Sequence, residues 1–208
     1  MNILATGAHF DDVELGCGAT LAKHAQNGDN VIIYVPTLSG YADYAKKVIR
    51  DNTVALKEGQ AAAEIIGATL IRDDFPTMRL EFVDELNAKL VQIVEENDID
   101  ILYTHWYGDI HHDHQALSKA SMHAGRHVKR ILMYRSNWYH SPYDFRGNFY
   151  VDVTDYWHIK EAAIMAHESE FERVGEKWLN FFRNESMNAG QKIGVSLAEP
   201  FEPVKWLA

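Results

Sequence analysis

The 208-residue chain has little of several residue types that mark particular classes of protein. Its only cysteine is Cys17, so no disulfide can form within the chain, and a reducing, cytoplasmic location is expected. No apolar run is long enough to span a bilayer, and the first residues lack the basic start and cleavage site of a secretory signal. Basic residues are also scarce: the chain has 20 Lys and Arg against 30 Asp and Glu, which gives a net charge of −10. Because phosphate binding needs clustered basic side chains, this charge argues against a nucleic-acid partner.

Segments of strand and helix character alternate through at least the first two thirds of the chain. Short apolar runs predict strands near residues 2–8, 31–35, 69–71, 101–104, 131–134 and 151–153. Apolar residues at helical spacing predict helices near residues 13–27, 53–66, 83–96, 115–125, 155–166 and 172–182. The alternation predicts an α/β fold whose mostly parallel, open sheet carries helices on both faces. No linker or repeat divides the chain, so a single domain over residues 1–208 is expected.

Two segments rich in histidine and aspartate follow predicted strands. The first is residues 8–14, at the end of the first strand, and the second is residues 109–114, a few residues after the strand at 101–104. In open α/β sheets, ligands bind outside the carboxyl ends of the strands, where the order of strands reverses. The two segments are therefore expected to meet at one edge of the sheet.

Their side chains together suit a catalytic metal. His9 and Asp12 from the first segment and His114 from the second supply two imidazoles and one carboxylate. That is the ligand set of a catalytic zinc with a fourth position left for water, and ferrous iron accepts the same donors. Such a metal would lower the pKa of its water and polarise a substrate carbonyl.

Three further residues of these segments have the chemistry of catalytic groups. Asp11 is adjacent to a ligand without being needed as one, which makes it the natural general base for the water. His111 is expected across the substrate, where an imidazolium would stabilise a tetrahedral oxyanion or protonate the leaving amine. Asp113 is expected to orient His111.

The motifs resemble those of a known family. Residues 8–22 (AHFDDVELGCGATLA) resemble the first signature of the LmbE-like, or PIG-L, de-N-acetylase family, and Asp109, His111, Asp113 and His114 resemble its second. Residues 166–170 and 194–201 are similar to two weaker elements, so the resemblance covers nearly the whole chain. It implies a Rossmann-like fold and zinc-dependent removal of N-acetyl groups from glucosamine-containing compounds. It also implies metal ligands at His9, Asp12 and His114, a base at Asp11, and a second catalytic histidine at His111 supported by Asp113.

The chain departs from the family pattern at several positions. Phe10 and His112 replace prolines, and Glu170 replaces a glutamine. Many members carry an arginine near the substrate at the position of Ala55, and Arg50 is the candidate to replace it as a substrate-binding residue.

Aromatic residues concentrate in the second half of the chain. Trp106 lies on the loop of the second motif, and Trp138 follows a predicted strand. Flat aromatic faces suit the apolar faces of sugar rings, so both are expected to line a substrate pocket. Exposed aromatic loops are also compatible with a homo-oligomer.

The leading hypothesis is a metal-dependent hydrolase in which metal-bound water, with Asp11 as general base, removes the acetyl group from an N-acetylated amino sugar or its conjugate. Another N-acyl amine is an alternative substrate. A second class is a non-catalytic carbohydrate or nucleotide-sugar binding module on the same fold, since fold does not imply function. A two-metal phosphodiesterase is disfavoured because too few additional carboxylates flank the motifs.

Overall fold

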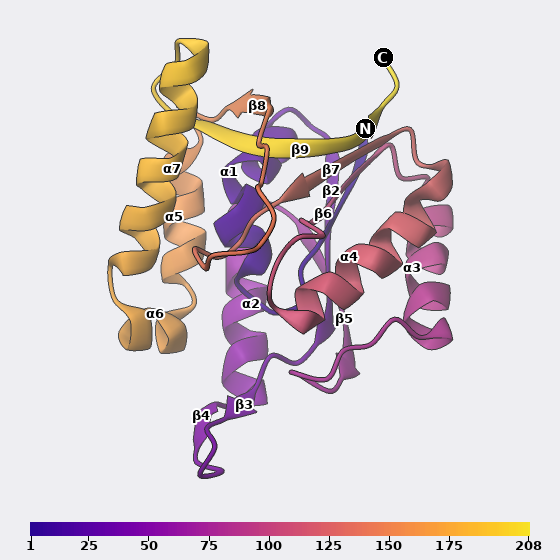
Figure 1. The fold of residues 1–208 in the computed structure, drawn as a ribbon, viewed down its shortest axis with the longest axis vertical. Helices are drawn as coiled ribbons and strands as arrows, with labels where there is room; N and C mark the ends of the chain where they lie inside the picture. The colour runs from indigo at the N-terminus through magenta and orange to yellow at the C-terminus, as the bar shows by residue number, and fades with distance from the viewer.

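A seven-stranded sheet forms the centre of the computed structural model, which describes residues 1–208 (Figure 1). Its strands, in order across the sheet, are β5 (Thr69–Phe75), β2 (Asn30–Thr37), β1 (Asn2–Thr6), β6 (Ile101–His105), β7 (Arg130–Tyr134), β9 (Ala198–Trp206) and β8 (Phe149–Asp152). The first five are parallel, and β9 runs antiparallel to both of its neighbours. A separate hairpin of β3 (Tyr41–Ala42) and β4 (Val48–Arg50) projects from the body.

Helices cover both faces of the sheet (Figure 1). One face carries α1 (Asp12–Gln26), α2 (Asn52–Ile66) and α5 (Trp157–Met165), and the other carries α3 (Asp84–Glu96), α4 (His112–Ala124) and the short 3-10 turn Gly125–His127. Two further helices, α6 (Glu168–Val174) and α7 (Lys177–Ile193), extend the first layer beyond α5. Each layer buries its own apolar cluster against the sheet, as expected for strands covered on both sides. No helix is long and apolar enough to cross a membrane.

The topology brings the two motif segments together. β1 pairs in parallel with β2 on one side and with β6 on the other, through Ile3 opposite Val31 and Ile3 opposite Ile101. The chain thus reverses its direction of travel across the sheet at β1 and β6, which creates a crevice at their carboxyl ends. The predicted fold class is confirmed.

The C-terminal third differs from the sequence prediction at one helix and contains one strand for which no prediction was made. The helix predicted over residues 172–182 is interrupted at Gly175, whose φ of 70° ends α6 before α7 begins. The additional strand is β9, which contains Pro200 and Pro203 although proline cannot donate to a sheet ladder. It nevertheless lies between β7 and β8, and its pairing with β7 shifts register between Ile131 and Leu132.

Candidate metal and catalytic site

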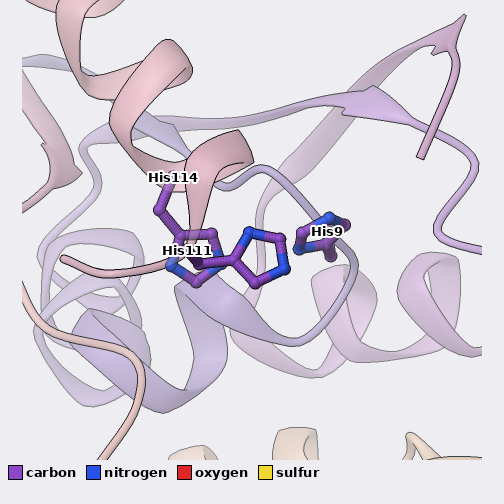
Figure 2. A group of neighbouring side chains, drawn as sticks. All are labelled: His9, His111 and His114. Carbon is purple, nitrogen blue, oxygen red and sulfur yellow. The ribbon is translucent and has the colours of Figure 1, made fainter. Parts of the chain in front are cut away.

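The site forms where the loop after β1 meets the start of α4 (Figure 2). The ends of β1 and β6 are joined by a hydrogen bond of 3.0 Å between the Oγ1 atoms of Thr6 and Thr104. Beyond these strand ends, the rings of His9, His111 and His114 gather with centroids 4.5 to 5.5 Å apart. Residues a hundred positions apart in the sequence therefore share one small volume, as the motif positions predict.

Two of the predicted metal ligands, His9 and His114, each face the third, Asp12. Asp12 presents one carboxylate oxygen to each histidine: Oδ2 lies 3.3 Å from Nδ1 of His9, and Oδ1 lies 3.2 Å from Nε2 of His114. Asp12 is in the first turn of α1, where the helix dipole favours a carboxylate. Burial favours its neutral form, but His114 foremost holds the pKa of Asp12 well below its usual range. The donor set is two imidazoles and an ionised carboxylate, which fits a divalent metal.

In each of the two histidines, the ring nitrogen that does not face Asp12 contacts a second carboxylate. Nε2 of His9 lies 2.9 Å from Asp113, and Nδ1 of His114 lies 2.9 Å from Asp109. Burial lowers the pKa of both rings, but the surrounding carboxylates outweigh it and raise the pKa to about 9 for His9 and about 10 for His114. Outer carboxylates of this kind fix which ring nitrogen is free to bind a metal. The free nitrogens are the two that face Asp12.

His105 offers an alternative ligand set with Asp12 and His114, because their donor atoms also lie within 4.8 Å of one another. Its ring stacks on that of His114 with centroids 4.0 Å apart. However, the backbone N–H of Ala8 donates to Nε2 of His105 at 3.0 Å, which occupies the lone pair of that nitrogen. His105 is therefore a support for the loop and for His114 rather than a free donor.

Asp11 is the residue expected to act as base, and it lines the cavity beside Asp12. Its φ of 123° lies in a region that side chains other than glycine rarely adopt, which is typical of strained functional positions. Burial raises the pKa of Asp11 to about 7, opposed by the nearby Arg50 guanidinium. A pKa near the working pH suits a group that accepts and returns a proton.

His111 also lines the cavity, but its surroundings differ from those predicted. The carboxylate of Asp113 contacts His9 rather than His111, while the backbone N–H of Asp113 donates to Nδ1 of His111 at 3.2 Å. Burial, together with His114 and His9, lowers the pKa of His111 to about 4. The ring is therefore neutral at pH 7 instead of an imidazolium. Because Nδ1 accepts, its proton is on Nε2, and His111 still has a donor to offer.

A cavity of about 280 Å³ opens over these side chains. Trp138 lines it as predicted, together with Tyr139 and Trp178, and we call these three residues the aromatic wall. Val174 also lines the cavity. Two other predicted substrate contacts do not reach the cavity. Trp106 is only 2% exposed and packs against Phe145, and the buried Arg50 lies behind Asp11.

Several polar residues of the site were not found from the sequence. Ser136 donates to Oδ1 of Asp12 at 2.9 Å, and the amide of Asn137 donates to Asp109 at 2.6 Å. Both follow β7, so their position after a predicted parallel strand was the signal available. Tyr41, Glu170 and Arg173 also line the cavity, with Tyr41 donating to Glu170 at 2.8 Å. Glu170 lies in the 166–170 element that resembles a family motif, and Arg173 lies in the predicted helix 172–182, but no sequence pattern placed these side chains or Tyr41 at the cavity.

Comparison with known proteins gives a consistent result. Residues 4–125 match the family described as GlcNAc-PI de-N-acetylase (PIG-L). The chain is 34% identical over 183 residues to the uncharacterized deacetylase YaiS of Escherichia coli, covering 80% of this chain and 90% of that protein. It is 26% identical over 221 residues to the diacetylchitobiose deacetylase of Thermococcus kodakarensis, covering 95% and 80% of the two chains.

Among solved structures, a 4-carboxy-2-hydroxymuconate hydratase of Pseudomonas putida superposes with a TM-score of 0.83 at 18% identity, over 100% of this chain and 97% of that one. At this identity the likeness concerns the fold alone, and it shows that the fold accommodates more than one reaction. The family match, by contrast, covers both histidine-bearing motifs and more than half of the chain. The chain belongs to the PIG-L family of GlcNAc-PI de-N-acetylases.

Proposed function

We propose that residues 1–208 form a single deacetylase domain that hydrolyses the N-acetyl group of an amino sugar or its conjugate. The observation that carries the proposal is that a ring nitrogen of His9 and one of His114 each face a carboxylate oxygen of Asp12, while Asp11 lines the same cavity beside them. The relatives support it, since one is a deacetylase of diacetylchitobiose and another a deacetylase of unassigned substrate. The donor set suits zinc, with ferrous iron as the alternative, and the single cysteine suits a cytoplasmic location.

The residues around the metal position divide the work of amide hydrolysis. His9, Asp12 and His114 would hold a divalent metal, which would supply Lewis acidity to activate water and to polarise the acetamide carbonyl. Asp11 accepts a proton from the attacking water as the new C–O bond forms. His111 donates from Nε2 to the carbonyl oxygen as negative charge develops there. When the C–N bond breaks, Asp11 returns the proton to the nitrogen, and acetate and a free amine leave.

The cavity supports an amino sugar as substrate. Its aromatic wall offers flat apolar surfaces for a sugar ring, and Tyr41, Glu170 and Arg173 offer partners for hydroxyl groups. A polycarboxylate of the kind the hydratase acts on fits less well. The lining contains Asp11, Asp12 and Glu170, and its one arginine, Arg173, is already paired with Glu170.

The proposal is tested by measuring acetate release from N-acetylglucosamine, N,N′-diacetylchitobiose and matched N-formyl and N-propionyl sugars, with the metal content determined by elemental analysis. We expect acetate and free amine in equal amounts, one metal per chain, and slower turnover of the propionyl compounds. A chelated sample that regains activity on addition of zinc is the positive control. Stoichiometric metal without turnover of any acylated amine would favour the binding module instead.

A further inference from the structure

Arg50 is a buried arginine that the proposed chemistry does not use. It ends β4, yet its side chain is only 2% exposed. One guanidinium nitrogen, Nη1, donates to the backbone carbonyl of Phe10 at 2.9 Å and lies 3.3 Å from Oδ2 of Asp11. Arg50 thus holds both the backbone and the side chain of the segment that carries the base.

The other end of the guanidinium is anchored in a second set of buried groups. Nη2 donates to Glu58 Oε2 on α2 at 2.8 Å and to Nδ1 of His167 at 3.1 Å. Glu58 is fixed in turn by Ser169, whose backbone N–H and hydroxyl both donate to it at 2.7 Å. Because a guanidinium only donates, Nδ1 of His167 must accept, so the ring proton is on Nε2. These contacts leave Arg50 no freedom to swing into the cavity.

We propose that Arg50 is a positioning residue that aims the carboxylate of Asp11 at the reacting water, and that it is not a substrate ligand. The inference rests on the proposed function, in which Asp11 is the base. Arg50 contacts Oδ2, which leaves Oδ1 to accept the proton. A planar guanidinium with two donating nitrogens can bridge Asp11 and Glu58 at once. An ammonium has its three donors on one atom and lacks the two spaced nitrogens that span these carboxylates here.

The backbone conformation of Asp11 gives an independent reason why neighbouring residues must hold this segment in place. A φ of 123° at a residue with a side chain persists only when the surroundings hold it. Arg50 bonds to the carbonyl of Phe10, directly before this position. Phe10 itself packs against Gly59 of α2, where an added Cβ would lie 2.4 Å from the ring. The loop is therefore fixed from behind by α2 and by Arg50 together.

The test is a double-mutant cycle between Arg50→Met and Asp11→Asn, with acetate release from N,N′-diacetylchitobiose as the assay and zinc content as the check on the metal. We expect Arg50→Met to lower kcat by about a hundredfold, the cost of a base displaced by roughly 1 Å, with KM changed by less than about threefold. In the Asp11→Asn background the same change should have almost no further effect, because interacting residues are not additive. Arg50→Lys should keep an intermediate kcat. Arg130→Met, at the opposite end of the sheet, is the control for loss of an arginine.

Crystal structures of zinc-loaded Arg50→Met and Arg50→Lys give a readout independent of turnover. We expect the Asp11 carboxylate to rotate or take several positions in Arg50→Met, while His9, Asp12 and His114 stay in place. If Arg50→Met does not fold, Arg50→Lys carries both measurements. The inference would be overturned if Asp11 does not move in Arg50→Met, or if Arg50→Met changes only KM. It would also be overturned if Arg50→Met lowers kcat by the same factor in the wild-type and Asp11→Asn backgrounds. Full activity of Asp11→Asn would instead overturn the proposed base and hence the mechanism.

Discussion

The two sides of the cavity are built in different ways. The histidine loops, residues 9–12 and 109–114, extend from neighbouring parallel strands, and the side chains of His9, Asp12, Asp109 and His114 all have hydrogen-bond or ion-pair partners. The aromatic wall comes from the segment after β7 and from α7, and Tyr139 is 55% exposed. One side is held by a network of hydrogen bonds and ion pairs, whereas the other is lined mainly by aromatic side chains, one of them exposed. This difference suggests that the histidine loops decide the reaction and the aromatic wall decides the substrate.

The largest effect is expected from a substitution of His114, on the histidine side of the cavity. His114→Ala removes a donor that faces Asp12 and leaves Asp109 without its imidazole partner. We expect the variant to lose its metal and to release no measurable acetate. The measurement is metal content by elemental analysis alongside turnover. His123→Ala, a histidine of the same helix outside the cavity, is the matched control and should retain both. Normal metal binding by His114→Ala would contradict the assignment of this side.

A smaller loss is expected at the outer carboxylates. Asp113→Asn and Asp109→Asn keep the shape of the side chain but weaken its hold on His9 and His114 respectively. Loss of such a partner typically lowers metal affinity by about 10- to 100-fold. Zinc titration against a competing chelator measures this directly. Unchanged zinc affinity in both variants would show that the histidines do not need these supports.

On the aromatic wall, Trp138→Ala should act on substrate binding. Aromatic contacts contribute about 0.5–1.5 kcal/mol each, so KM is expected to rise by about two- to tenfold while kcat changes little. Trp106→Ala is the contrasting variant, because Trp106 is buried and does not line the cavity. It should lower the unfolding free energy by about 3–5 kcal/mol with KM unchanged. Steady-state kinetics and thermal denaturation separate the two effects, and a fall in kcat alone for Trp138→Ala would contradict the division.

The smallest effect is expected at Glu170, which accepts from Tyr41 and pairs with Arg173. Glu170→Gln keeps a hydrogen-bonding oxygen but removes the charge. We expect kcat for the preferred substrate to change little, because Glu170 contacts Tyr41 and Arg173 and none of the proposed metal ligands or the base. The ratio of kcat/KM between N-acetylglucosamine and N,N′-diacetylchitobiose should shift instead. An unchanged ratio would argue that this polar group does not contact the sugar.

Much of the fold and of the histidine loops could be predicted from the sequence, because both are local. A β-branched run such as Val31–Val35 and the spacing of His9 and Asp12 after a strand express their structure within a few residues. Strand topology then places His114 beside them. The prediction failed where the outcome depends on tertiary contacts. The sequence could not show that the Asp113 carboxylate would turn to His9, or that Trp106 would be buried.

Strand β9 and several cavity residues could not be predicted from the sequence for a related reason. The prolines of β9 argue locally against a strand, but its pairing with β7 and β8 outweighs that preference. Tyr41 and Glu170 lie 129 residues apart and meet only because a hairpin and a short helix flank the same cavity. No local pattern encodes such a meeting, so apart from Trp138 the residues of this side of the cavity could be located only from the structure.

The central claim is that one divalent metal is held by His9, Asp12 and His114, and that Asp11 does not coordinate it. Anomalous diffraction from crystals of the zinc-loaded protein tests it most directly. We predict a single strong peak within bonding distance of Nδ1 of His9, Nε2 of His114 and a carboxylate oxygen of Asp12, with Asp11 outside that distance. A peak coordinated by His105 or by Asp11 in place of any of the three would contradict the account.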